Sequence, residues 1–242
     1  RIGPMLGTLY GIGVGPGDPD LLTLKAVKIL GRVGHVFAAS SSSNDYSLAL
    51  DIVRDHLPRE VPVSFLDFPM TFNKDRLEEA WRANCETVVE RLEAGVHVAF
   101  LTLGDPMTFS TFIYLLRKIR SRLPQVPVEI VPGITSYQAA AACAAVPLSE
   151  AEETLTVISG AKGGERLPDV LPFSDNVVLM KAYKHFPQIL QKIRDLGLQD
   201  RVCFVSRCGL DGQVVEKDFA ALEGLKPHYL SLLIVKKTGT PP

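Results

Sequence analysis

Three short loops, rich in glycine, carboxylates and hydroxyls, are the segments of this sequence whose residue types suggest binding chemistry. They are Gly15-Pro16-Gly17-Asp18, Gly104-Asp105-Pro106 and Pro132-Gly133-Ile134-Thr135-Ser136. Glycine lets a ligand or another stretch of backbone approach closely. Little positive charge accompanies the loops, whereas a phosphate ligand would favour cations. The loops therefore favour a ligand that carries positive charge and hydrogen-bonds to backbone and hydroxyl groups.

The first glycine-rich segment also suggests a dinucleotide-binding fingerprint, but that fingerprint is incomplete in both reading frames. Counting from Gly11 places Pro16 at the third glycine position, and counting from Gly13 places Asp18 there. A pyrophosphate needs the N-terminus of a helix at this point, and a carboxylate would repel it. We therefore do not expect NAD or FAD.

Other residues with reactive side chains do not form a recognisable catalytic or metal-binding motif. The histidines are scattered, and we interpret His97 as a core residue within a strand. The cysteines form no C-x-x-C pair, so we expect them to be reduced and to bind no metal, although Cys203 and Cys208 could be neighbours. Residues 160–164 lack P-loop spacing, and we interpret them as a flexible surface loop or a lid over a substrate.

The elements that must position the loops alternate between strand and helix in the first half of the chain. The pattern predicts strands at 9–14, 36–39, 61–66, 96–103 and 128–131, and helices at 21–30, 46–56, 77–92, 111–119 and 137–145. The 77–92 helix is the clearest, because its apolar residues from Trp81 to Leu92 recur on one face. Alternation of this kind implies a parallel sheet, whose ligands bind beyond the carboxyl ends of the strands. The glycine loops, together with residues 40–43 and 67–70, then share one edge.

The second half of the chain has a different pattern, with strands expected at 155–159, 177–180, 202–206, 214–216 and 230–235 and one long helix at 186–196. We expect a second α/β domain with a mixed sheet. Pro147 ends the regular pattern of the first half. The predicted domains are therefore residues 1–147 and 148–242, with a hinge near 147–153.

Bulk composition excludes several classes of protein. The chain has 242 residues, 46% of them hydrophobic, and a net charge of −1, which is ordinary for a globular protein without a nucleic-acid partner. The longest apolar stretch, residues 96–103, is too short to span a bilayer. No signal peptide is apparent after residues 1–4 are set aside, so we expect no membrane association and a cytoplasmic location.

Taken together, the loops resemble the motifs of the tetrapyrrole (corrin/porphyrin) methylase family. Val14–Pro19 followed by Leu21-Leu22-Thr23 is similar to the family's opening signature, and the Leu103–Pro106 and Pro132–Ser136 segments are similar to its second and third motifs. The resemblance implies two α/β domains with S-adenosylmethionine in the cleft between them, and a homodimer. S-Adenosylmethionine also suits the loop chemistry, since it has a sulfonium cation, an adenine and a ribose diol.

The resemblance carries cofactor contacts over to individual positions of this sequence. They are Pro16, Leu103, Gly104, Asp105, Thr108, Thr135, Ser136, Met180 and Gly209. We expect the backbone of Gly104 and Asp105 to hold the adenosyl portion and the methionine tail. Met180 should pack on the adenine as an adaptable apolar surface.

Within the family, three segments resemble the branch that methylates carbon 20 of precorrin-2 or of cobalt-factor II in cobalamin biosynthesis. They are Phe68-Pro69-Met70, Ser110-Thr111 and Met180–Lys184. Relatives that methylate uroporphyrinogen III have an acidic residue after the second strand, where this chain has Phe37–Ser41. This departure argues against the uroporphyrinogen activity and leaves no general base to carry over.

The implied reaction needs alignment of the methyl group with an electron-rich bridging carbon, exclusion of water, and an acceptor for the released proton. That acceptor stays open among Tyr183, His185 and Glu165. A carboxylate-rich substrate also needs cations around it, and the candidates in or beside the loops are Lys74, Lys162, Arg166, Lys181, Lys184 and Arg207.

Three alternatives to the carbon-20 activity are a tetrapyrrole methylase with different regiospecificity, a non-catalytic tetrapyrrole- or adenosine-binding protein, and a methylase of RNA or protein histidine. The absence of a basic stripe disfavours RNA.

Overall fold

A computed structural model describes residues 5–40, 47–69, 71, 73–239 and 242. The contacts within the chain divide it into two units, Arg1–Thr135 and Ser136–Pro242. Each unit contains one sheet of five strands with helices on both faces. The expectation of two α/β units, one with a parallel sheet and one with a mixed sheet, is confirmed.

The sheet of the first unit is entirely parallel, with strands in the order β3-β2-β4-β1-β5. The strands are β1 (Leu9–Gly13), β2 (His35–Ser40), β3 (Val63–Asp67), β4 (Val98–Thr102) and β5 (Val128–Val131). Because all five run the same way, their carboxyl ends meet at one edge, as the sequence predicts. The loops after β2 and β3 include residues 41–43 and 70, which lie outside the described residues.

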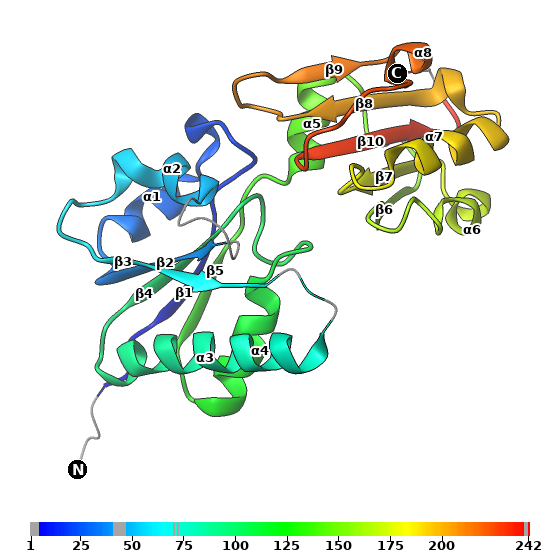
Figure 1. The fold of residues 1–242 in the computed structure, drawn as a ribbon. Helices are drawn as coiled ribbons and strands as arrows, with labels where there is room; N and C mark the ends of the chain where they lie inside the picture. The colour runs from blue at the N-terminus through cyan, green and yellow to red at the C-terminus, as the bar shows by residue number, and fades with distance from the viewer. Residues whose placement is uncertain (1–4, 41–46, 70, 72, 240–241) are drawn as a thin grey trace. The chain divides into compact units, whose positions relative to one another are not determined.

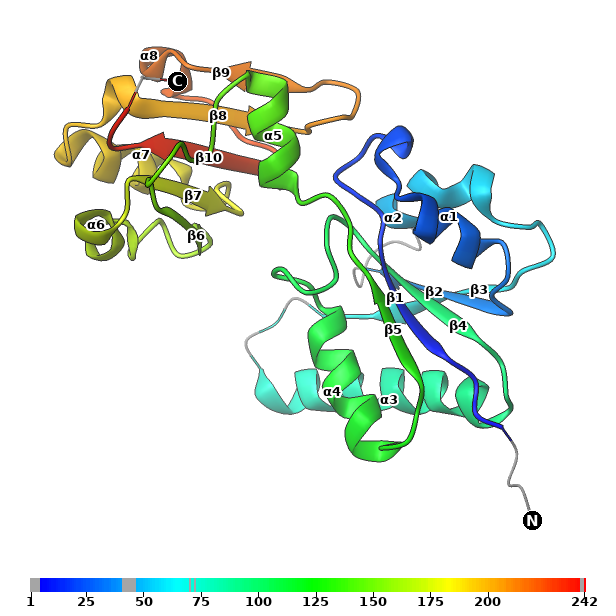
Figure 2. The ribbon, with the colours of Figure 1, turned by 180° about the vertical axis from the view of Figure 1, so that it is seen from behind.

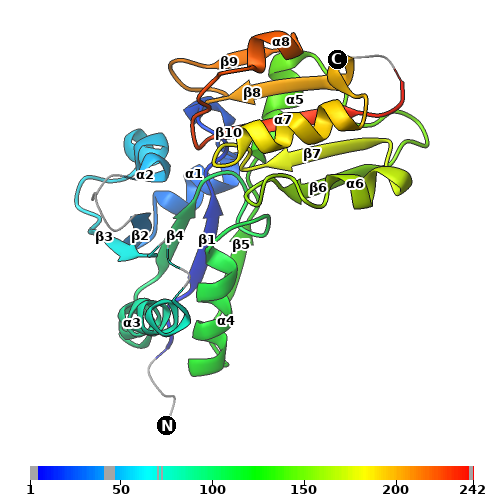
Figure 3. The ribbon, with the colours of Figure 1, turned by 45° about the vertical axis from the view of Figure 1, so that its right-hand side comes forward.

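Helices cover both faces of this sheet, as Figures 1 and 3 show. On one face lie α1 (Leu24–Leu30) and α2 (Leu48–Val53), and on the other α3 (Lys74–Glu93) and α4 (Phe112–Arg122); the 3-10 turns Pro19–Leu21 and Arg54–His56 adjoin the first pair. The alternation of side chains along β4 supplies both cores, since Val98 and Phe100 pack with α3 and α4 whereas Ala99 and Leu101 pack with α1 and α2.

Local sequence signals define where these helices begin and end. The Thr23 hydroxyl accepts the Ala26 N–H at 3.2 Å at the start of α1, and the Asn73 side chain accepts the Arg76 N–H at 3.1 Å at the start of α3. Gly95, with a φ of 79°, follows the end of α3. The predicted apolar face of α3 is confirmed, because the side chains of Cys85, Val88, Val89 and Leu92 are buried.

The sheet of the second unit is mixed, with strands in the order β6-β7-β10-β8-β9. The strands are β6 (Leu155–Ser159), β7 (Asn176–Met180), β8 (Val202–Ser206), β9 (Val214–Glu216) and β10 (Ser231–Lys236). Strand β10 is antiparallel to both β7 and β8, so the carboxyl ends of β6, β7 and β8 meet at one edge where β10 begins. One face is covered by α6 (Leu167–Val170), α7 (Phe186–Asp195) and α8 (Phe219–Leu222), with the 3-10 turns Leu171–Phe173 and Gln199–Arg201 nearby.

The opposite face of the second sheet is covered by α5 (Ser136–Ala144), as Figure 2 shows from behind. Its small residues Ala140, Ala141 and Ala144 pack with strands β7, β8 and β10. Residues 147–153 are tied to the same unit, because the buried Lys236 ammonium donates to the Pro147 carbonyl at 3.0 Å and lies 3.7 Å from the Glu153 carboxylate. The contacts therefore place the division after Thr135, ahead of the predicted boundary at Pro147.

The expectation that His97 is a core residue is wrong. His97 precedes β4 and is exposed, although its Nδ1 accepts the Thr8 N–H at 3.0 Å. The core histidine is His35, which is 4% exposed and whose Nε2 lies 2.9 Å from the Ser64 hydroxyl. Among the described residues, no helix is both long and apolar enough to cross a membrane.

The burial of His35 predicts a stability that falls in mild acid. Burial, and then the charge of Arg91, lowers the pKa of this histidine below its ordinary value of 6.5. The unfolded chain therefore binds a proton below that pH while the folded chain resists it, so acid favours unfolding. We expect the unfolding free energy to decrease from about pH 7 to about pH 5.5 in denaturant titrations.

The variant His35→Phe keeps a ring against Phe37 but cannot titrate, so its stability should depend less steeply on pH over the same range. A residual slope is expected from His228, whose pKa is also lowered by burial. Equal slopes in the folded variant and the parent chain would show that His35 does not cause the effect.

Candidate functional site

The glycine loops of the first unit are joined through their backbones at the carboxyl edge of the parallel sheet. Gly104 donates its N–H to the Gly15 carbonyl at 2.7 Å, and Gly15 donates in return to the Gly104 carbonyl at 3.2 Å. This pair continues the association of β1 and β4 beyond the strands. The loops that follow two neighbouring strands are thus held together before any side chain contributes.

Close packing at this edge leaves no room for side chains at two of the glycines. A Cβ placed on Gly133 would lie 2.1 Å from the Gly104 carbonyl oxygen, and one on Gly13 would lie 2.5 Å from the Gly133 nitrogen. Both neighbours are backbone atoms, which cannot move aside as the end of a side chain can. Glycine is therefore required here for close approach of β1 and the loops after β4 and β5, the role that the sequence predicts.

The Asp105 carboxylate holds the loops after β4 and β5 in register. One oxygen accepts the Met107 N–H at 2.9 Å and the Thr108 hydroxyl at 3.3 Å, and the other accepts the Gly133 N–H at 3.1 Å. Both oxygens of this carboxylate therefore already accept hydrogen bonds from within the protein. Asp105 therefore offers its backbone, more than its side chain, to a ligand.

The residues that follow Asp105 form a tight turn into α4. Ser110 is buried, shares a hydrogen bond of 2.8 Å with the Thr102 hydroxyl and accepts the Phe112 N–H at 3.1 Å. Phe109 has a φ of 52°, an uncommon conformation for a residue with a side chain, and it is exposed. Of the predicted cofactor residues nearby, Leu103 and Thr108 are half-buried. Pro16 and Thr135 are buried.

The remaining predicted cofactor residues lie in the second unit. The Ser136 hydroxyl, at the first residue of α5, lies 3.5 Å from the Met180 sulfur at the end of β7. Gly209 follows β8 with a φ of 74°, and its N–H donates to the Gln213 side chain at 2.8 Å. Met180 is thus the last residue of β7 and Gly209 lies beyond the end of β8, two strands that run parallel with β10 between them.

Five of the predicted substrate cations lie in the loops after β6, β7 and β8. Lys162, Arg166, Lys181 and Lys184 are exposed, and Arg207 is half-buried. Lys181 and Arg207 immediately follow their strands with positive φ values of 59° and 53°. The sixth cation, Lys74, is an exposed residue at the start of α3 in the first unit.

The candidate proton acceptors differ in their surroundings. Tyr183 is half-buried, with the Lys184 ammonium 5.9 Å from its ring centre, whereas His185 and Glu165 are exposed. The expectation of a flexible surface loop at 160–164 is wrong for Gly163 and Gly164. Both are buried, and Cβ atoms on them would meet side chains of α7.

The sequence motifs do not single out His228 and Tyr229, which lie just before β10 at the edge where β6, β7 and β8 end. The His228 Nδ1 accepts the Leu230 N–H at 3.2 Å, and the two rings are 4.4 Å apart. Burial, followed by the charge of Arg207, lowers the pKa of His228. The signal that would find them is the antiparallel insertion of β10 between β7 and β8, which periodicity alone does not reveal.

The four cysteines are free of disulfide bonds. Burial raises the pKa of Cys203 and of Cys208 to about 11, so both are thiols at neutral pH. The Cys208 thiol contacts the Cys143 thiol on α5. Among the described residues, no group of three or more histidines, cysteines or carboxylates is placed to hold a metal ion.

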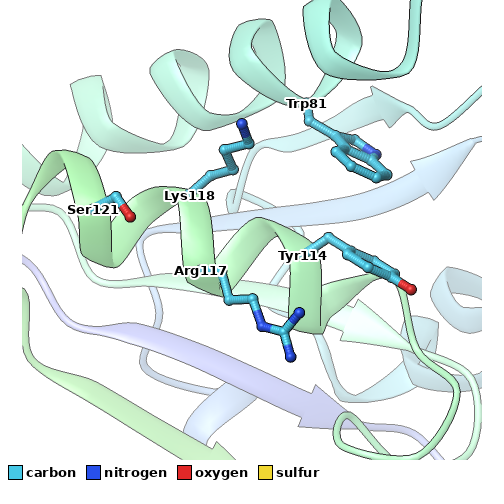
Figure 4. Close-up of a pocket in the computed structure, with 5 residues that line it drawn as sticks. All are labelled: Trp81, Tyr114, Arg117, Lys118 and Ser121. Atoms are coloured by element: carbon cyan, nitrogen blue, oxygen red, sulfur yellow. The ribbon is translucent and has the colours of Figure 1, made fainter. Parts of the chain in front are cut away.

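A hollow of about 270 Å³ lies between α3 and α4. Figure 4 shows the Trp81 ring of α3 beside the Tyr114 ring of α4, and the two are stacked at 5.0 Å with Arg117 and Lys118 flanking them. The Lys118 ammonium pairs with Glu78. None of the predicted site residues lines this hollow, so we assign it to the packing of the two helices.

Comparison with known proteins gives a consistent result. A sequence profile of the Tetrapyrrole (Corrin/Porphyrin) Methylases matches residues 8–222. The chain is 36% identical over 234 residues to a cobalt-precorrin-2 C(20)-methyltransferase of Salmonella typhimurium, covering 96% of this chain and 98% of that protein. It is 35% identical to a probable cobalt-precorrin-2 C(20)-methyltransferase of Methanocaldococcus jannaschii, covering 95% and 96%.

Among solved structures, the fold matches a uroporphyrin-III C-methyltransferase of Thermus thermophilus complexed with S-adenosylhomocysteine. The TM-score is 0.69 at 24% identity, covering 96% of this chain and 92% of that one.

The packing of the glycine loops predicts a severe effect of Gly133→Ala. The added methyl overlaps the Gly104 carbonyl, so the loops must separate, at a cost of roughly 1–3 kcal/mol or more in unfolding free energy. The matched control is Gly31→Ala, because Gly31 has an ordinary φ of −71° and its Cβ would lie 3.7 Å from the nearest atom. Denaturant unfolding should show the control within about 1 kcal/mol of the parent chain. Equal stability of the two variants would contradict the close approach.

Proposed function

This chain belongs to the tetrapyrrole (corrin/porphyrin) methylase family, and we propose that it transfers a methyl group from S-adenosylmethionine to carbon 20 of precorrin-2 or cobalt-factor II in cobalamin biosynthesis. The observation that carries the proposal is identity of 35–36%, over almost the whole chain, to relatives named for this reaction on the cobalt-containing substrate. A further relative, 32% identical over 84% of this chain, is named precorrin-2 C(20)-methyltransferase.

S-Adenosylmethionine fits the chemistry of the predicted cofactor residues. The edge of the first unit offers backbone groups of the loops after β1 and β4, with the Asp105 carboxylate already satisfied by Met107, Thr108 and Gly133. In the second unit, Met180 offers a polarizable sulfur beside the Ser136 hydroxyl. The structural neighbour complexed with S-adenosylhomocysteine supports the same choice.

The cofactor supplies a methyl group already activated by its sulfonium, so the protein must chiefly orient the reactants and exclude water. Correct alignment of this kind can contribute about 7–11 kcal/mol to lowering a barrier. The backbone loops fixed by Gly13, Asp105 and Gly133 provide rigid positions for such orientation. The proton that leaves the methylated carbon needs an acceptor, and Tyr183, His185 and Glu165 are the candidates in the loops of the second unit.

Calorimetry tests the cofactor assignment. S-Adenosylhomocysteine should bind without metal or tetrapyrrole, at about one site per chain. The double variant Thr135→Val, Ser136→Val should bind it at least ~10-fold more weakly, equivalent to ~1.4 kcal/mol, because it removes both hydroxyls and adds apolar bulk at position 136.

The matched control for the loss of a hydroxyl is Thr87→Val, on the exposed face of α3, where the hydroxyl bonds only within its own helix. It should bind S-adenosylhomocysteine as the parent chain does. Unchanged affinity in a folded double variant would remove residues 135–136 from the cofactor site.

Methyl transfer itself is tested by offering precorrin-2 and its cobalt form separately with a carbon-13-labelled methyl donor. Carbon NMR of the product should locate one new methyl at carbon 20, because relatives at 35–36% identity are named for that position. A label at carbon 2 or 7 would indicate a methylase of different regiospecificity. Binding without transfer to either compound would favour a non-catalytic tetrapyrrole- or adenosine-binding protein.

A symmetric homodimer is proposed as the assembly, because cyclic dimers are the commonest oligomers and the sequence motifs resemble a dimeric family. Light scattering at micromolar concentration measures this directly, and the mass of a single 26.4 kDa chain would count against it.

A further inference from the structure

The edge of the second sheet, where β10 begins, brings together three hydrogen-bond donors from separate parts of the chain. We propose that Arg207, His228 and Tyr229 form a binding site for one carboxylate group of the substrate, beside the proposed cofactor residues Met180 and Gly209. The inference rests on the proposed function, since a carboxylate-rich tetrapyrrole is the substrate class that such a site would serve.

Backbone hydrogen bonds fix the position of the segment that carries His228 and Tyr229. The Arg207 N–H donates to the Leu230 carbonyl at 3.0 Å, and the Ala182 N–H donates to the Ser231 carbonyl at 3.1 Å. The segment that enters β10 therefore lies between the loop after β7 and the loop after β8. Two of the proposed cofactor residues of this unit, Met180 and Gly209, lie within two residues of these bonds.

The Ser231 hydroxyl strengthens this arrangement. It lies 2.9 Å from the Ser206 hydroxyl and 2.6 Å from the His228 carbonyl. Ser206 and Ser231 are both buried. The backbone of His228 is thus tied to β8 as well as to β10, so its ring is carried by a rigid part of the sheet edge.

His228 is held as a neutral donor. Its Nδ1 accepts the Leu230 N–H at 3.2 Å, so the proton of the neutral ring resides on Nε2. The charged groups that face the ring reinforce this state, because burial and then the Arg207 charge lower its pKa. The ring therefore presents an N–H to a ligand and no lone pair.

Tyr229 is a second neutral donor. Its side chain is 52% exposed, and its ring packs against the His228 ring with centres 4.4 Å apart. Burial raises the pKa of the phenol above its ordinary value of 10.0, an effect that the Arg207 charge opposes. The hydroxyl therefore keeps its proton at neutral pH.

Arg207 supplies the positive charge of the site. Its Nε donates to the Asp211 carbonyl at 2.7 Å, which orients the half-buried guanidinium. Within the part of the chain that the structure describes, Arg207 forms no ion pair with a carboxylate. One fixed cation with two neutral donors suits a singly charged carboxylate better than a phosphate, which favours several cations.

The carboxylate could come from the tetrapyrrole or from the methionine tail of the cofactor, and binding measurements distinguish the two. Uroporphyrin III is a stable, carboxylate-rich porphyrin whose fluorescence reports binding, and S-adenosylhomocysteine is measured by calorimetry. The variants are Arg207→Gln, His228→Asn and Tyr229→Phe. The control is Arg59→Gln, which removes an exposed arginine of the first unit.

We expect Arg207→Gln to weaken uroporphyrin III binding about 10-fold at low salt and to reduce its salt dependence, because a charge-assisted hydrogen bond is lost. His228→Asn and Tyr229→Phe should each weaken it about 3-fold, the usual effect of one neutral hydrogen bond. Arg59→Gln should change it by less than about 2-fold. The affinity for S-adenosylhomocysteine should be unchanged in all four.

The outcomes separate this inference from the proposed function. Uroporphyrin III affinities that match the Arg59→Gln control in folded variants would overturn the carboxylate site alone. A loss of S-adenosylhomocysteine affinity in its place would assign the three donors to the cofactor tail and also overturn the inference. A parent chain that fails to bind uroporphyrin III would overturn the tetrapyrrole proposal and the inference with it. Tyr229→Phe removes only a hydroxyl, so it keeps the test decisive even if Arg207→Gln does not fold.

Discussion

The first unit depends on the close approach of three backbone segments at the carboxyl edge of its sheet. Gly13 and Gly133 lie so close to each other and to the Gly104 carbonyl that neither has space for a Cβ, and the Asp105 carboxylate joins the loops after β4 and β5 through the Gly133 N–H. Because these contacts are made by backbone atoms, the loops cannot separate by a change of side-chain rotamer. An edge of this kind suits a ligand such as an adenosyl group, which is recognised by hydrogen bonds more than by charge.

In the second unit, the order and direction of the strands bring the chemical groups together. Strand β10 runs antiparallel between β7 and β8, so its first residues lie beside the last residues of its neighbours. Met180, Arg207 and the segment before Ser231 thereby share one edge although they are far apart in the chain. The first unit fixes backbone with a half-buried carboxylate and glycines, whereas the second collects cationic and neutral donors.

The sequence predicts the first unit well, because alternating strands and helices permit few arrangements and the loop motifs must then share an edge. The sequence predicts less where packing between distant parts of the chain decides the structure. Helix α5 joins the second unit because Ala140 and Ala144 pack on its sheet, and the glycine loop at 163–164 is buried against α7. Periodicity does not reveal that β10 is the central strand, and so it does not indicate that His228 and Tyr229 lie at the sheet edge beside Arg207. The apolar run around His97 predicts a core position for it, whereas His97 precedes the strand and faces solvent.

The central position of β10 also bears on the order in which the protein folds during synthesis. The first unit has all its strands once residue 131 has left the ribosome, so its sheet can assemble while translation continues. The second sheet lacks its middle strand until residues 231–236 emerge, and before then β7 and β8 have no partner between them. Nascent chains should therefore contain a folded first unit and an incomplete second sheet, in which β7 and β8 each expose a row of unpaired backbone N–H and C=O groups that a chaperone would cover.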